Sequence, residues 1–84
     1  MKTVKFEACI DQLCGFCPAD LEGYHWEFKD GDRHYRYDIT ECYFNEDDDE
    51  FVKFTVLTNE PDALAIGVMD SFLWNIEEEA KKYF

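Results

Sequence analysis

Aromatic and polar residues alternate beside one tight-turn signal, and this pattern constrains the fold of the chain more than any other feature. The alternation covers residues 24–29, and Asp30-Gly31-Asp32 follows it. A period of two residues is typical of a strand with one buried face. Glycine accepts the positive φ that tight hairpin turns require. We therefore expect an antiparallel hairpin with strands over residues 24–29 and 33–44.

Two further segments show the same alternation. Apolar residues recur at every second position of residues 3–10 and of residues 51–58, which predicts two more strands. Within residues 33–44 the phase of the alternation shifts by one residue near Thr40–Glu41, and such a slip predicts a β-bulge or a bend. The acidic run 45–50 is expected to be a loop, because like charges on neighbouring positions of a sheet repel one another.

Residues 11–23 predict an irregular connection between the first two strands. Gly15, Pro18 and Gly23 interrupt any regular element there. A single helical turn near residues 19–21 is the regular structure that we expect in this connection.

The remainder of the chain predicts one long helix. Asn59 or Thr58 is expected to cap its N-terminus, and Pro61 suits its first turn, where no backbone N–H partner is needed. Two ion pairs are expected at i,i+4 spacing, Glu77–Lys81 and Glu78–Lys82. An apolar stripe follows the helical period: Ala65, Met69, Phe72, Leu73, Ile76, Ala80 and Tyr83, widened by Leu64, Ile66, Val68 and Trp74.

Four strands followed by one helix predict an α+β fold. The simplest architecture is a four-stranded antiparallel sheet with the long C-terminal helix packed on one face. Hydrophobic residues make up 46% of the chain and aromatic residues 18%, a composition typical of a packed core and not of a disordered acidic chain. A chain of 84 residues has room for one core, so residues 1–84 are expected to form a single domain.

Four cysteines suggest a metal or redox site as one alternative. Cys9, Cys14 and Cys17 have the spacing C-x4-C-x2-C, with Cys42 further on. This order resembles the cluster-binding pattern of plant-type 2Fe–2S ferredoxins. Cys14 and Cys17 also have the spacing of half a zinc site, and with Pro18 behind them they are similar to a thioredoxin-like redox motif. We expect free thiols and no cofactor, since a second closely spaced ligand pair is missing. A zinc-binding or redox mini-domain built on all four cysteines is the alternative.

Two histidines flank the predicted hairpin. His25 and His34 are expected on one face near Glu27 or Asp38, and a histidine beside a carboxylate can act as a general base. No nucleophile motif accompanies them, so we expect a polar sheet face and no enzymatic activity. The acidic run 47–50 lacks the spaced acids and the glycine of an EF-hand, so no specific cation site is expected.

Twenty acidic residues against eight basic ones give the chain a formal net charge of −12. Residues 45–84 contribute −8 of this charge and residues 1–44 contribute −4. Such a surface repels nucleic acid and anionic membranes and attracts basic surfaces. With no signal-peptide pattern and no apolar stretch long enough to span a bilayer, we expect a cytoplasmic protein.

In size and charge the chain resembles the phage-encoded anti-CRISPR and DNA-mimic inhibitors, and also the acidic immunity proteins that neutralise nuclease toxins. The resemblance is one of composition and covers no sequence motif. It implies a small acidic binding protein that inhibits a nucleic-acid-handling protein by occupying its basic groove. The residues expected to contact the partner are Glu46, Asp47, Asp48, Asp49, Glu50, Glu77, Glu78 and Glu79, with Tyr35, Tyr37 and Trp74 as aromatic anchors where they are exposed.

A small homo-oligomerising structural domain is a further alternative. In that case an aromatic sheet face left open by the single helix would form the seam of a homodimer.

Overall fold

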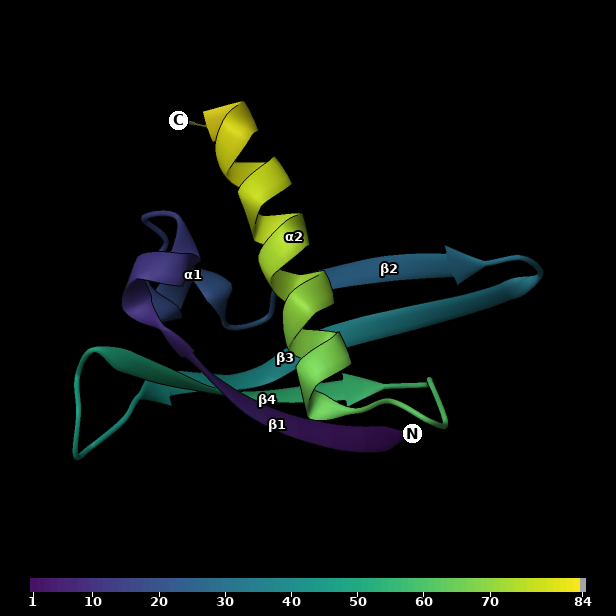
Figure 1. Cartoon of the computed structure of the whole chain (residues 1–84), viewed down its shortest axis with the longest axis horizontal. Coiled ribbons are helices and arrows are strands. Elements are labelled where there is room, and N and C mark those ends of the chain that lie inside the picture. The colour runs from purple at the N-terminus through teal and green to yellow at the C-terminus, as the bar shows by residue number, and fades with distance from the viewer. Residues whose placement is uncertain (84) are drawn as a thin grey trace.

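The computed structural model of the chain describes residues 1–83 and confirms the predicted α+β fold (Figure 1). Four strands form one antiparallel sheet in the order β1-β4-β3-β2. A single long helix, α2, crosses one face of this sheet. The elements follow one another as β1 (Lys2–Cys9), a 3-10 helix (Ile10–Leu13), α1 (Pro18–Leu21), β2 (His25–Asp30), β3 (Arg33–Phe44), β4 (Phe51–Thr58) and α2 (Ala65–Tyr83).

The hairpin and the bulge lie where the alternation predicts them. β2 pairs with β3 from His25 opposite Asp38 to Asp30 opposite Arg33, and Gly31 in the turn has a φ of 61°. The register of β3 against β4 shifts between Ile39 and Glu41, which is the predicted bulge. Because the shift inserts one residue, the apolar side chains on both sides of it stay on the same face of the sheet.

The predicted helical turn in the first connection is confirmed as α1, which has Pro18 as its first residue. The 3-10 helix at Ile10–Leu13 was not predicted. It begins where the backbone N–H of Cys9 donates to the side-chain oxygen of Gln12 at 3.0 Å. This contact is one half of a capping box, so the Gln three residues after Cys9 was the available sequence signal.

The predicted start of the long helix is wrong, since α2 begins at Ala65 and not near residue 59. The Asn59 side chain accepts a hydrogen bond from the backbone N–H of Arg36 at 2.8 Å and donates to the carbonyl of His34 at 3.2 Å. Thr58 accepts from the N–H of Glu60 at 3.1 Å and so caps a turn. Asn59 therefore prolongs the pairing of β4 with β3, and residues 61–64 lead into the helix without belonging to it.

The buried face of α2 is narrower than the predicted stripe. It consists of Val68, Phe72 and Ile76, which recur every four residues. Ala65 and Tyr83 from the predicted stripe are exposed, as are the flanking residues Leu64, Ile66 and Trp74. One helix on one sheet face can bury only the side chains that point at the sheet, so the opposite flank stays in solvent.

The predicted i,i+4 ion pairs are also replaced. Lys81 Nζ lies 3.0 Å from Glu78 Oε1, and Lys82 Nζ lies 3.8 Å from Glu79 Oε2. Both pairs have i,i+3 spacing, which also brings side chains together on a helix surface.

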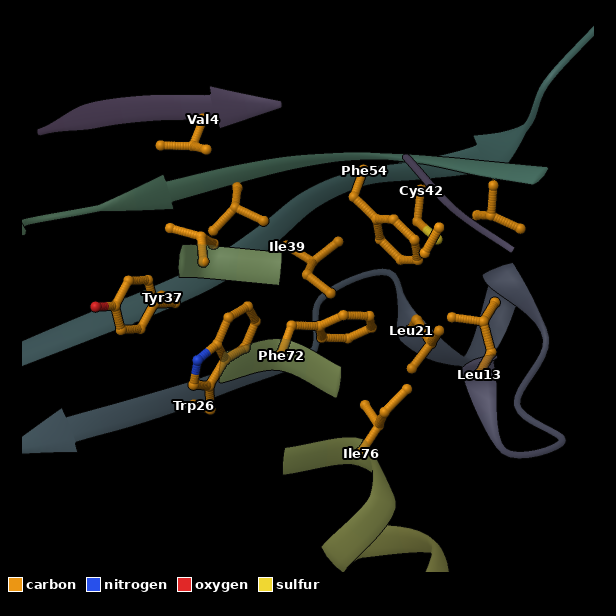
Figure 2. Close-up of a cluster of buried hydrophobic side chains, with 14 of the residues drawn as sticks. Val4, Leu13, Leu21, Trp26, Tyr37, Ile39, Cys42, Phe54, Phe72 and Ile76 are labelled. Carbon is orange, nitrogen blue, oxygen red and sulfur yellow. The ribbon is translucent and has the colours of Figure 1, made fainter. Parts of the chain in front are cut away.

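An aromatic cluster holds α2 against the sheet. The Phe72 ring is fully buried, with ring centroids 4.9 Å from Phe54, 5.5 Å from Trp26 and 5.7 Å from Phe6. In Figure 2 this ring lies in the middle of the cluster, with Trp26 on one side and Leu21 on the other. Trp26 and Tyr37 of the hairpin are thus buried beneath the helix, whereas Phe28 and Tyr43 remain exposed.

Truncating the Phe72 ring tests how much this cluster contributes to the stability of the fold. Phe72→Ala is expected to lower the free energy of unfolding by about 3–5 kcal/mol, because it removes buried ring contacts and leaves a cavity. Ile66→Ala on the exposed flank of the same helix is expected to change it by less than ~0.5 kcal/mol. Urea unfolding followed by circular dichroism measures both, and a cost below about 1 kcal/mol for Phe72→Ala would contradict this view of the core.

Candidate partner-binding surfaces

The outer face of the sheet, which points away from α2, carries balanced charge. The register of the four strands places four basic and four acidic side chains on it: Lys5, Lys29, Arg36 and Lys53 with Glu7, Glu27, Asp38 and Glu41. Arg36 lies 3.2 Å from Asp38, and His34 lies 3.1 Å from Glu27. Since these eight side chains add no net charge, the −12 of the chain is carried by its remaining residues.

The largest run of acids, the acidic loop Glu46–Glu50, is an ordered connection between β3 and β4. The side-chain oxygen of Asn45 accepts from the N–H of Asp47 at 2.8 Å, and the side chain of Asp48 accepts from the N–H of Glu50 at 3.0 Å. The carbonyl of Glu50 accepts from the N–H of Ile10 at 2.8 Å, which ties the loop to the end of β1. Five consecutive acidic residues are therefore held in a fixed backbone shape.

The acidic loop is also unneutralised. All five of its residues are exposed. Over the described range 1–83, the ion pairs of the protein join other residues and none reaches this loop. The five negative charges of the acidic loop are therefore exposed to solvent and are not neutralised by ion pairs with other described residues.

The three consecutive acids of α2 are placed differently. Glu78 and Glu79 are half-buried and pair with lysines of the same helix, while Glu77 is exposed. The hydrogen bond from Lys81 to the Glu78 carboxylate raises the pKa of Lys81. The pKa of Tyr24 is raised by burial and then by the negative charge of Glu79, which faces the start of β2. The helical acids are thus partly neutralised and partly committed to contacts within the fold.

The two acidic clusters do not form one continuous array. In Figure 1 the acidic loop lies at one end of the sheet, whereas the C-terminal half of α2 runs past the sheet beside the segment that holds α1. The eight acids selected from the sequence therefore divide into two separate surfaces.

The three predicted aromatic anchors have three different environments. Tyr37 is only 4% exposed, and its hydroxyl donates to Glu60 at 2.5 Å, so it does not meet the condition of exposure set for an anchor. Burial, reinforced by this hydrogen bond, raises the pKa of Tyr37. Tyr35 is half-buried and accepts from Arg33 at 3.4 Å. Trp74 is 63% exposed and satisfies the condition set for an anchor.

Trp74 lies on an apolar groove that was not predicted. The groove has a volume of about 560 Å³ and lies between the first half of α2 and the inner face of the hairpin. Leu64, Trp74 and Phe28 give it three large exposed apolar side chains, and Glu60 adds an acidic group. The first half of the predicted helix is apolar almost all round, and this was the sequence feature that could have indicated an exposed apolar surface. Whether that surface forms a groove depends on where the hairpin lies.

The four cysteines are not assembled into a site. Cys42 is buried in the core, Cys17 is exposed, and Cys9 and Cys14 are half-buried. Residues 1–83 contain no group of three or more histidine, cysteine or acidic side chains placed to hold a metal ion, and this includes the acidic loop. Cys14 ends the 3-10 helix in a left-handed conformation, and α1 starts only after Cys17. The first cysteine of the pair therefore lacks the helix N-terminus that a thioredoxin-like motif requires.

Comparisons with protein-family models, with curated proteins and with solved structures find no match to this chain. Among residues 1–83, no helix combines the length and the apolar character needed to cross a membrane.

The cysteine environments predict unequal reactivity. Burial, with a further contribution from the charge of Glu22, raises the pKa of Cys42 to about 12, so its reactive thiolate form is scarce. At about pH 8, alkylation by iodoacetamide is expected to reach exposed Cys17 at least ~100-fold faster than Cys42. Mass spectrometry of quenched samples measures both rates. Equal rates in the folded protein would contradict the buried position of Cys42, and unfolding in urea should remove the difference.

Proposed function

We propose that the protein is a small acidic binding protein that captures the basic surface of a nucleic-acid-binding protein and thereby excludes the nucleic acid. The observation that supports this proposal best is the acidic loop. Its five consecutive acidic residues are exposed, none of them takes part in an ion pair within residues 1–83, and the side chains of Asn45 and Asp48 hold its backbone by hydrogen bonds.

The placement of charge favours a localised contact over general solubility. A chain that needed charge only for solubility would gain it from acids scattered over every face. Here the outer sheet face carries equal numbers of acidic and basic side chains, and two of the three consecutive acids of α2 form ion pairs with lysines. The acidic loop has neither basic side chains among its residues nor ion pairs to other described residues. The loop is therefore the part of the surface best suited to basic side chains that otherwise bind phosphates.

Such a contact has recognisable kinetics. A concentrated negative patch steers a basic partner and accelerates association, and salt screens this effect over a length of about 8 Å at physiological ionic strength. Association is therefore expected to slow as salt rises, while apolar contacts formed after encounter govern dissociation.

Charge reversal in the acidic loop tests the proposal. The protein is immobilised and used to capture partners from the lysate of its native host at low and at high salt, and the eluted proteins are identified. The Asp47→Lys, Asp48→Lys, Asp49→Lys triple variant is expected to lose the salt-sensitive partner, because its loop no longer presents an unbroken run of acids.

A matched control separates the loop from net charge. Asp11→Lys, Glu22→Lys, Asp32→Lys changes three exposed acids at scattered positions, so both triple variants carry a net charge of −6 in place of −12. Capture should survive in this control. The recovered partner is then tested for nucleic-acid binding with and without the protein. Equal loss of capture in both variants, or a partner that still binds nucleic acid when saturated, would refute the proposal.

A further inference from the structure

We infer that the apolar groove beside Trp74, here called the α2–hairpin groove, receives one face of a positively charged amphipathic α-helix of the partner protein. The inference rests on the proposed function, in that it takes the partner to be basic. It adds a second contact surface, distinct from the acidic loop, and states the form of the segment that binds there.

The groove has the length of a helical contact. Its lining on α2 extends from Gly67 to Asn75, and Leu64 lines it directly before the helix begins. At about 1.5 Å per residue this helical stretch is roughly 12 Å long, or just over two helical turns. The opposite wall is the inner face of the hairpin at Phe28, which is 50% exposed.

The sheet offers room for a second helix beside α2. Figure 1 shows the β2–β3 arm projecting past α2, with no other element over it. Two strands span about 10 Å, which matches the diameter of one helix with its side chains. Adjacent helices pack with their axes about 8–10 Å apart, so a helix in the groove would contact both α2 and the arm.

The charges around the groove favour a basic occupant. Among residues 1–83, no lysine or arginine lines it, and the acidic side chain that faces it is Glu60, since the Glu27 carboxylate points to the outer sheet face, where it pairs with His34. The Glu60 carboxylate is held in place by the hydroxyl of Tyr37 at 2.5 Å. A second copy of this chain would itself carry a net charge of −12, and repulsion between the two copies opposes dimerisation.

Two exposed apolar side chains, those of Leu64 and Trp74, form the centre of the proposed apolar contact with the partner helix. Leu64 is 69% exposed and Trp74 is 63% exposed, and both line the groove. Large exposed apolar side chains grouped with an exposed tryptophan are typical of protein-binding surfaces. A leucine-like side chain of the partner helix would cover them, while a lysine or arginine beside it reaches Glu60.

Gly67 allows the groove to be blocked without disturbing the core. It lines the groove, and a Cβ atom added there would meet no atom within 4 Å. The Gly67→Leu side chain would therefore enter the groove, and loss of the glycine would also favour the helix by up to ~1 kcal/mol. Ala65→Leu is the matched control, since Ala65 is exposed on the same helix and does not line the groove.

Tryptophan fluorescence reports occupancy directly. Trp26 is buried and donates to Ser71 at 3.0 Å, so solvent-dependent changes in emission arise mainly from Trp74. The probe is a synthetic leucine–lysine amphipathic peptide of about 14 residues, or four helical turns. We expect a saturable blue shift, a rise in Kd of about tenfold or more for Gly67→Leu, and a change below ~twofold for Ala65→Leu.

Two further peptides and one variant separate the outcomes. A peptide with the same lysines and no leucines should bind weakly, and so should one with the same leucines and no lysines. If Gly67→Leu binds the amphipathic peptide as well as the unmodified protein does, the groove is not the site and the inference fails. Tight binding of either single-property peptide also overturns it.

The test of the groove is independent of the test of the acidic loop. The Asp47→Lys, Asp48→Lys, Asp49→Lys variant should retain the Gly67-sensitive component of peptide binding, so failure of the loop proposal would leave that result unchanged. Light scattering at rising protein concentration examines the remaining occupant. A dimer that Gly67→Leu dissolves would show that a second copy fills the groove and would overturn the inference.

Discussion

The packing of Phe72 against the aromatic inner face of the sheet is the contact on which the rest of the structure depends. Its ring lies against Phe54, Trp26 and Phe6, which come from three different strands. This contact fixes the line along which α2 crosses the sheet. The crossing in turn decides which flank of the helix faces solvent and leaves the groove open along the β2–β3 arm (Figure 1).

A compact core also allows this chain to carry its charge. A net charge of −12 on 84 residues repels itself, and a disordered chain would relieve the repulsion by expanding. Buried aromatic surface offsets this cost, and the five consecutive acids without ion pairs lie in an exposed loop, where solvent screens them. The outer sheet face therefore carries equal numbers of acidic and basic side chains, and the longest run of acids lies outside the strands.

Local patterns predicted what depends on neighbouring residues. The alternation over residues 24–29 and the phase slip near Glu41 foretold the hairpin and the bulge, because strand faces and register follow directly from period and turn chemistry. The start of α2 was mispredicted because the Asn59 side chain can form hydrogen bonds of two different kinds. Its side chain suits a helix cap, but in the folded chain it bonds to the backbone of β3, which lies far away in the sequence. Tyr37 was selected as an anchor for its residue type, and only the position of Glu60 shows it to be buried and engaged.

The sequence by itself determined the four strands, the single long helix and the amount of negative charge, since period, turn residues and composition are local properties. The tertiary structure alone decided how that charge is distributed: balanced on the outer sheet face, partly paired on α2 and free on the acidic loop. It also decided that Trp74 and Leu64 line a groove with Phe28. Both results depend on which distant segments pack together, and burial of apolar surface in three dimensions sets that choice.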